Sequence, residues 1–328
     1  MQAAQIDELS LAILRIVLRH QRLAKPLGCT HHPCDRCMSA HRERVAWFLD
    51  HQTPVDFVLP AFPGKSPNTS KVLGVGPDMA EDLSLSFLRK LCGEIQNIYA
   101  PGARVIICSD GHVFGDLVRI TDPDITFYQT KLREIITKAG PGPLHLFGLN
   151  DQYPAHTYDM MRTKLIEGYG EDIDELKLRV RTGELVVLYR GLTRFLLEDT
   201  DGFDHEKSRA ARQRECRERA YGVIQRSRAW GRLIAQRFPA AVRLSIHPQP
   251  CGSTKLGIKL LGPPNSCSDN WITPWHSTAV DVGGRFILMK RHQAEALGAK
   301  LVYLHGRPSH YVARQSSLST NTPPCLVA

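Results

Sequence analysis

The 328-residue chain has no apolar run long enough to cross a bilayer. Its most apolar stretch near the beginning, Leu9 to Leu18, is short and is interrupted by Arg15. No basic, apolar and small-residue pattern opens the chain, so we expect neither a signal peptide nor a membrane partner. The nine cysteines are odd in number and widely scattered, which is not the pattern of a disulfide framework. We therefore expect a cytoplasmic protein whose cysteines stay mostly reduced.

The sequence also lacks the glycine-rich motifs that bind nucleotides. There is no Gly-x-Gly-x-x-Gly, and Gly64-Lys65-Ser66 matches only the end of a P-loop, because Leu59 replaces its first glycine. Pro63 and Pro67 further remove backbone donors that a P-loop would direct at phosphate. A lysine and a hydroxyl in this loop can still hold one phosphate or carboxylate, and an ordinary loop is the alternative.

Acidic residues are fewer than basic ones, 33 against 42, which gives a net charge of +9. Such a charge suits an anionic ligand, for example a sugar phosphate, or a nucleic acid. Nine arginines lie between Arg209 and Arg237, in a segment that we expect to be one long helix. They are spread around the helix and interleaved with glutamates, which favours a solvated helix with ion pairs one turn apart. No nucleic-acid-binding motif accompanies them, so we expect no nucleic-acid partner.

The first half of the chain alternates between short apolar runs and segments of helical periodicity. We expect helices at residues 6–22, 43–51, 79–99 and 125–138, and buried strands at residues 55–60, 105–108 and 144–149. From the first strand onward this is a β-α-β-α-β order, which implies parallel strands joined by right-handed crossovers. The sequence therefore predicts a Rossmann-like α/β fold with three layers.

The second half changes from helices to short strands. Residues 153–238 are expected to be mostly helical, including residues 172–181 and a segment after Gly183. Short strands are expected at residues 242–247, 255–261, 277–282, 286–289 and 301–305, and the first four would form an antiparallel meander that extends the sheet. We expect a helical segment at residues 1–54, one catalytic α/β domain at residues 55–313, and a disordered tail at residues 314–328.

Two strands of the predicted sheet are each followed by a polar loop. In open α/β sheets, ligands bind outside the carboxyl ends of the strands, so we expect these loops to converge on one pocket. Carboxylates and imidazoles can move protons near neutral pH, whereas Asp110 or Asp116 capping a helix is the alternative. The six side chains are Lys65, Ser66 and Asn68 after the first strand, and Asp110, His112 and Asp116 after the second.

Polar residues also recur along the predicted strands of the second half. Arg243, Ser245 and His247 alternate with apolar residues and therefore share one face of their strand. Cations and imidazoles are costly in a core, which favours a lined cavity. The further residues are Lys255, Lys259 and His276 on what we expect to be neighbouring strands.

The segment from Tyr189 to Arg194 offers another cation for an anionic ligand. Arg190 is the candidate that we name for this role. The alternative is that the segment is structural, with an ion pair between Arg194 and Glu198 one helical turn away.

A group of cysteines and histidines lies ahead of the second predicted helix. Cys34 and Cys37 have the Cys-x2-Cys spacing of half a structural zinc site. Cys29, His31, His32 or His41 would complete it. No second Cys-x2-Cys exists, which favours a reduced, partly buried loop, and a zinc ion here would act as a folding clamp.

Several of these segments together resemble the pyoverdine/dityrosine biosynthesis family, and in particular its PvcA-type isocyanide synthases. The resemblance runs from about Phe57 to Val282 in consistent order. The segments that carry it are Phe57–Asn68, Lys71–Gly74, Cys108–Asp116, Tyr189–Gly191, Arg243–Pro248, Lys255–Ile258 and Thr273–His276.

This resemblance implies conversion of the amino group of an aromatic amino acid, with tyrosine favoured over tryptophan, into an isonitrile. It implies ribulose 5-phosphate as the carbon donor, no organic cofactor and no metal. It also implies a role in secondary metabolism, with the product passed to a tailoring oxygenase. N-formylation of tyrosine, as in the dityrosine branch, and a basic scaffold or nucleic-acid-binding protein are the alternatives.

For an isonitrile synthase we expect two groups of site residues. The catalytic group is Asp110, His112, His247, His276 and Lys259. The substrate-binding group is Lys65, Ser66, Asn68, Lys71, Asp116, Arg190, Arg243 and Lys255.

Overall fold

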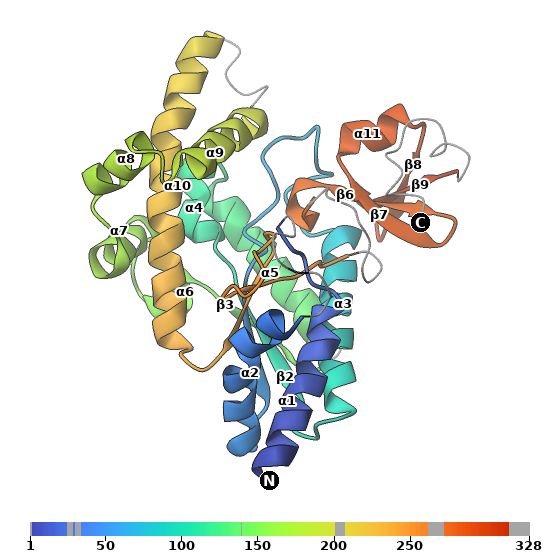
Figure 1. The fold of residues 1–328 in the computed structure, drawn as a ribbon. Helices are drawn as coiled ribbons and strands as arrows, with labels where there is room; N and C mark the ends of the chain where they lie inside the picture. The colour runs from blue at the N-terminus through green and yellow to red at the C-terminus, as the bar shows by residue number, and fades with distance from the viewer. Residues whose placement is uncertain are drawn as a thin grey trace.

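A sheet of five parallel strands lies at the centre of the computed structural model, in the order β3-β2-β1-β4-β5 (Figure 1). Its strands are β1 (Val55–Pro60), β2 (Ala103–Cys108), β3 (Leu144–Phe147), β4 (Val242–Ser245) and β5 (Leu256–Gly257). β1 and β2 pair along their whole length, from Val55 with Ala103 to Pro60 with Cys108. The structure describes residues 2–24, 29, 34–138, 140–200, 207–261 and 272–314. The expected disordered tail lies outside these ranges from residue 315 onward, and so do His31 and His32.

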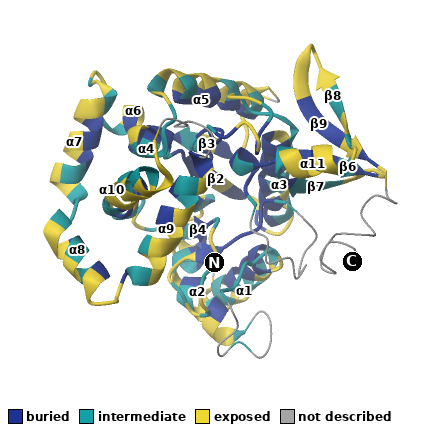
Figure 2. Cartoon of the chain, turned by 90° about the horizontal axis from the view of Figure 1, so that it is seen from above, coloured by how far each residue is buried: buried dark blue, intermediate teal, exposed yellow. Residues whose placement is uncertain are grey.

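Helices cover both faces of this sheet, which confirms the expected three layers. Successive residues of a strand point to opposite faces, so Phe57 and Leu59 pack in one core cluster and Val58 packs in another. The first cluster joins the sheet to α1 (Ala3–Leu18), α2 (Asp35–Asp50), α3 (Met79–Gln96) and α5 (Asp122–Thr137). The second joins it to α4 (Gly111–Val118), α6 (Leu149–Gln152), α7 (Tyr158–Tyr169) and α10 (Arg209–Arg237). Figure 2 shows the buried strands between these layers.

The arginine-rich helix α10 is the long axis of a helical subassembly. Figure 1 shows α7, α8 (Ile173–Arg181) and α9 (Val186–Asp199) arranged around it. Its arginines pair mainly with other elements rather than one turn along. Arg219 donates to the carbonyl of Leu117, and Arg228 lies 3.1 Å from Glu171. Within the helix, Arg219 lies 3.6 Å from Glu215.

The strands of the second half are arranged differently from the expected antiparallel meander. β4 pairs in parallel with β1, and β5 pairs in parallel with β4, so both extend the first sheet without a hairpin. A second sheet has the order β7-β6-β9-β8 and carries the short helix α11 (Arg291–Ala296). Its strands are β6 (Thr278–Val282), β7 (Arg285–Met289), β8 (Lys300–Leu304) and β9 (Arg307–Ala313). Only β6 and β7 form the expected hairpin, and Figure 1 shows this sheet at one side of the molecule.

The segment that follows α1 is extended rather than helical. Gln21 pairs with Ile258 and Leu23 with Gln249 in isolated bridges, so residues 20–24 run beside β5 and the turn before it. Gly257 permits this approach, because a Cβ at that position would lie 2.2 Å from the carbonyl oxygen of Arg22. The chain thereby brings its beginning to the carboxyl end of β4.

Other elements also depart from expectation. α2 begins at Asp35 instead of residue 43, and the helix α4 begins only three residues after the end of β2. α11 and β9 were not expected at all. In the described ranges, no helix is both long enough and apolar enough to span a membrane.

Candidate active site

The strand order reverses between β1 and β4, and this position defines the candidate site. From β1 the chain builds outward through β2 and β3, and then returns to place β4 on the other side of β1. The carboxyl ends of two such strands diverge, which makes a crevice where open α/β sheets bind ligands. The loop after β1 and the turn after β4 both leave the sheet at this point.

Lys65, in the loop after β1, is enclosed by a buried polar cluster. Its Nζ lies 2.8 Å from Asp78 and 2.8 Å from Glu81, and donates to the carbonyl of Pro274 at 3.0 Å. Burial lowers the pKa of Lys65, but the two carboxylates outweigh it and the net pKa is raised. Burial raises the pKa of Glu81 to about 7, although Lys65 opposes it, and the Tyr128 hydroxyl donates to Glu81 at 3.1 Å.

These contacts give Lys65 a different place from the one that we expected. A lysine has three N–H donors, and each has a partner in this cluster. None is left for a phosphate or a carboxylate of a substrate. Lys65 therefore ties together the loop after β1, the start of α3 and the 3-10 turn η1 (Pro274–His276).

Lys71, Asp199 and His276 form a second constellation beside the first. Lys71 Nζ lies 2.5 Å from Asp199 Oδ1 and 3.2 Å from Glu198. His276 Nδ1 lies 3.5 Å from Asp199 Oδ2, and the ring of Phe195 packs edge-on against the imidazole. Burial lowers the pKa of His276 although Asp199 raises it, while the charge of Lys71 lowers it further. A neutral imidazole beside a carboxylate and an ammonium is suited to proton transfer.

Ser66 and Asn68 hold the loop that carries these lysines. The Ser66 amide donates to the carbonyl of Trp275 at 2.8 Å, and the Asn68 side chain donates to the carbonyl of Glu198 at 2.9 Å. Both residues are buried. The loop is therefore fastened to η1 and to the end of α9, which brings Asp199 and His276 to Lys71.

His247 occupies the turn after β4. Its side chain is accessible to solvent, yet protein surrounds it on most sides, and this burial lowers its pKa to about 4. The charges of Arg22, Lys255 and His276 also lower it. Arg22 donates to the carbonyl of Ile246 at 2.7 Å. His276 lies on η1 and not on a strand, and its closeness to His247 stays a prediction.

Asp110 lies two residues after the end of β2 and is surrounded by protein. Burial raises its pKa to about 7, and its Oδ1 has no hydrogen-bond partner among the described residues. Asp110 is the N-cap residue of α4, but its side chain makes no capping hydrogen bond, so the capping alternative is not observed. The charge of Asp110 contributes to the raised pKa values of Tyr128 and Cys108. Asp110 can therefore act as an acid or base near neutral pH, and Glu81, whose pKa is also raised to about 7, is the other such carboxyl in this region.

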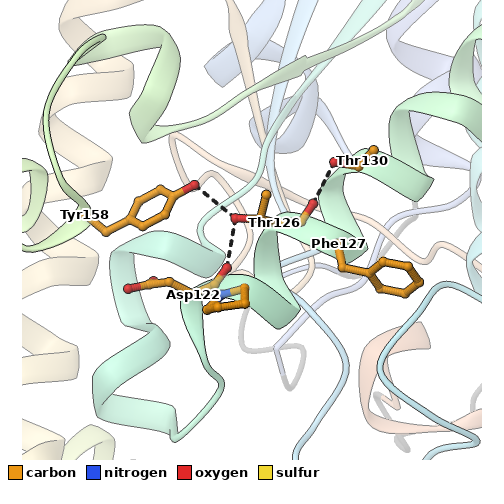
Figure 3. Close-up of a pocket in the computed structure, with 6 residues that line it drawn as sticks. Asp122, Thr126, Phe127, Thr130 and Tyr158 are labelled. Atoms are coloured by element: carbon orange, nitrogen blue, oxygen red, sulfur yellow. Dashed lines mark hydrogen bonds between the residues drawn. The ribbon is translucent and has the colours of Figure 1, made fainter.

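The structure does not bring His112 and Asp116 to these groups. A Cβ at Gly111 would lie 1.8 Å from the carbonyl oxygen of Pro63, so α4 starts against the loop after β1 and directs His112 away. His112 stacks on Tyr158 at 3.7 Å and lies 3.1 Å from Asp122, beside an open pocket of about 580 Å³ between α5 and α7 (Figure 3). Asp116 forms a two-pronged ion pair with Arg226 of α10.

Four further residues were expected in the site, namely Arg190, Arg243, Lys255 and Lys259. Arg190 is exposed on α9, and Lys255 is exposed just before β5. Arg243 is half-buried on β4 and donates to the carbonyl of Gly231 at 3.2 Å. Lys259 is buried, and its backbone amide donates to the backbone carbonyl of His20 at 2.9 Å.

Four residues of the site were missed by sequence reasoning: Arg22, Asp78, Glu81 and Asp199. Asp78 and Glu81 carried a signal, because an aspartate three residues before a glutamate at the start of a helix forms a capping box. That pattern predicts a helix start, but it does not show that both carboxylates also face a lysine. Arg22 and Asp199 carried none, since they reach the site through long-range folding.

Comparison with known proteins agrees with this architecture. A sequence model described as "Pyoverdine/dityrosine biosynthesis protein" matches residues 45–302. An L-tyrosine isonitrile synthase of Pseudomonas aeruginosa is 50% identical over 273 residues, 82% of this chain and 82% of that protein. The L-tryptophan isonitrile synthase AmbI2 of Fischerella ambigua is 44% identical over 318 residues, 96% of this chain and 95% of that protein.

A solved structure is similar over nearly the whole chain. The crystal structure of the PvcA protein from Pseudomonas aeruginosa matches with a TM-score of 0.86 and 46% sequence identity. The match covers 93% of this chain and 99% of the PvcA chain. The family that the motifs predicted is confirmed, and the chain is an enzyme of the pyoverdine/dityrosine biosynthesis protein family.

Proposed function

We propose that this enzyme converts the amino group of L-tyrosine into an isonitrile, with ribulose 5-phosphate as the carbon donor. The observation that carries the proposal is the 50% identity with an L-tyrosine isonitrile synthase over 273 residues. Similar enzymes named for L-tryptophan are 44% and 40% identical, so tryptophan is the second substrate to test. The proposal includes a place in secondary metabolism, with the product passed to a tailoring oxygenase.

The reaction needs several proton transfers. The amine of the amino acid attacks the ketone of the sugar phosphate and loses water to form an imine, and carbon–carbon cleavage and elimination follow. Each step requires a group that gives up or takes a proton near neutral pH. Asp110, with a pKa raised by burial to about 7, and the neutral imidazole of His276 are the groups that we assign to these transfers.

The sugar phosphate requires positive charge held in a fixed position. Burial is the main cause that lowers the pKa of His247 to about 4, and the charges of Arg22 and Lys255 lower it further. A phosphate dianion would relieve this repulsion, because it offers each cation an acceptor. We therefore assign phosphate binding to Arg22 and Lys255 rather than to Lys65.

The test is incubation of the purified enzyme with L-tyrosine and ribulose 5-phosphate, followed by mass spectrometry of the product. We expect the isonitrile of tyrosine, and uniformly carbon-13-labelled ribulose 5-phosphate should add a single labelled carbon. A formamide, heavier by one water, would instead indicate the N-formylating reaction. L-tryptophan and ribose 5-phosphate serve as controls for the amino acid and for the ketose. Consumption of neither substrate would refute the proposal.

A further inference from the structure

Four cysteines from three separate parts of the chain meet beside the turn after β4. Cys29 precedes α2, Cys34 is its N-cap residue, Cys37 lies in its first turn, and Cys251 follows β4. Their sulfur atoms all lie within 4.8 Å of one another. Cys251 Sγ lies 3.3 Å from Cys34 Sγ and 3.5 Å from Cys37 Sγ. None of the four forms a disulfide.

This geometry matches a tetrahedral site for one metal ion. Zinc binds cysteine sulfur at about 2.3 Å, so the corners of a regular tetrahedron are about 3.8 Å apart. The observed spacings, 3.3 Å and 3.5 Å within an outer limit of 4.8 Å, lie around that value. A disulfide would use two of the sulfurs and leave the convergence of the other two without a function.

The local backbone holds the sulfurs in this arrangement. The amide of Cys37 donates to the carbonyl of Cys34 at 3.0 Å, so the first turn of α2 sets the Cys-x2-Cys pair on one side. Gly252 has a φ of +73°, which turns the chain sharply after Cys251. The guanidinium of Arg36 lies beside Gly252, where its charge offsets the negative charge of a site with four thiolates.

We propose that Cys29, Cys34, Cys37 and Cys251 bind one structural zinc ion. Cys251 is the ligand that sequence spacing could not identify, since it is more than 200 residues from the Cys-x2-Cys pair. Four protein ligands fill a tetrahedral zinc site and leave no position for water or substrate. The ion is therefore a structural clamp and takes no part in the chemistry.

The clamp would fix two segments that carry site residues. The amide of Arg22 donates to Gly257 at 2.8 Å, and the amide of Ala24 donates to Gln249 at 2.9 Å, so residues 20–24 and the turn after β4 are already paired. Zinc would lock the far ends of both segments, at Cys29 and Cys251. Arg22 and His247, which lie on these segments, would be positioned by the ion without touching it.

The test begins with metal analysis of the full-length protein, purified under reducing conditions from zinc-supplemented cells. We expect one zinc ion per chain by mass spectrometry of the elements. Replacement of zinc by Co²⁺ should give the thiolate-to-cobalt charge-transfer band and the visible bands of a tetrahedral site. These measurements do not depend on catalytic activity.

Two variants sharpen the test. Loss of a residue that only hydrogen-bonds to a metal ligand lowers metal affinity by roughly 10–100-fold. Loss of a ligand itself should have a larger effect, so Cys251→Ser should weaken zinc binding by at least about 100-fold. Cys92→Ala removes a buried free cysteine of α3 outside the cluster and should keep the full zinc content. The proposal is overturned by purified protein that neither contains zinc nor binds added Zn²⁺ or Co²⁺. It is equally overturned by bound iron in place of zinc, by a native Cys34–Cys251 disulfide, or by full zinc content in Cys251→Ser.

Discussion

Replacement of Lys65 by methionine removes the only positive charge that directly contacts Asp78 and Glu81 in the described part of the buried cluster. Methionine keeps most of the side-chain volume, so the loss is chiefly electrostatic. Removing one partner of a buried ion pair typically costs about 3–5 kcal/mol, because the other charge stays buried without compensation. Proteins are stable by only about 5–15 kcal/mol, so Lys65→Met should unfold at a much lower denaturant concentration than the wild type.

The loss of stability in Lys65→Met should also depend on pH, and the environment of Glu81 determines its direction. Burial raises the pKa of Glu81 to about 7 from an ordinary 4.5, while Lys65 holds it down. Without Lys65 the pKa of Glu81 rises further. A carboxyl whose pKa is raised in the folded state stabilises the fold at low pH and loses that contribution as the pH rises through the folded pKa. The deficit of Lys65→Met should therefore be smallest near about pH 5.5 and grow by about 1 kcal/mol from about pH 7 to about pH 8.

The assay is urea unfolding followed by circular dichroism at these pH values. Lys131→Met is the matched control, because Lys131 makes an exposed ion pair with Glu134 within α5 and should cost less than about 1 kcal/mol. The double variant Lys65→Met/Glu81→Gln should recover part of the loss, since it removes one of the two carboxylates left without a cation. A Lys65→Met deficit below about 1 kcal/mol that does not change with pH would refute the reasoning.

The other predictions concern the chemistry and the chain pairing at the site. His276→Asn should lower kcat/KM by about 10²–10⁴-fold without unfolding the protein. The control His145→Asn, at an exposed position on β3, should keep the wild-type kcat/KM, and equal values of kcat/KM for the two variants would exclude proton transfer by His276. Asp110→Asn should abolish the change of rate near pH 7, because burial raises the pKa of Asp110 to about 7. The ionised form of Asp110 is costly to bury, so this variant should raise the melting temperature more at about pH 8 than at about pH 5. A difference in melting temperature that does not change with pH would contradict this. Gly257→Ala should lower the free energy of unfolding by about 1–3 kcal/mol, because the added Cβ would meet the carbonyl oxygen of Arg22. Gly191→Ala on α9 has open space around the added Cβ and should be neutral or stabilising, so similar unfolding midpoints for the two variants would count against the pairing of residues 20–24 with β5.

Local patterns in the sequence were sufficient for much of the first sheet. β1, β2 and β3 are short uninterrupted apolar runs, and the helical spacing between them requires crossovers, so their parallel pairing follows. The same reasoning located the loop after β1 and the position of Asp110. It did not give the partners of β4 and β5, since a short alternating strand specifies which face is buried and not which strand it pairs with. The long helix α10 that precedes β4 provides the crossover that a parallel pair needs.

Side-chain roles were harder to predict than strands, because they depend on the burial of each charge. Lys65 in a polar loop was expected to meet a ligand, but the apolar packing of α3 and η1 encloses it, and an enclosed lysine requires internal carboxylates. His112 was expected in the pocket because it lies in the polar loop that follows the second predicted strand. The helix that starts at Gly111 turns consecutive side chains by about 100°, and so His112 and Asp110 face different clusters.

The site is assembled from segments that no local interaction would hold together. Arg22 lies on the strand-like segment after α1, Lys71 on the loop after β1, Asp199 at the end of α9, and His276 on η1. Each segment is fixed by a different device: backbone bridges to β5 for Arg22, the buried ion pair for Lys71 and Asp199, and the Lys65 contact with Pro274 for η1. Because these devices lie next to one another, loss of one should displace groups held by the others. Three measurements therefore test whether these segments are held together in one assembly. They are the stability of Lys65→Met, the stability of Gly257→Ala and the zinc content of the protein.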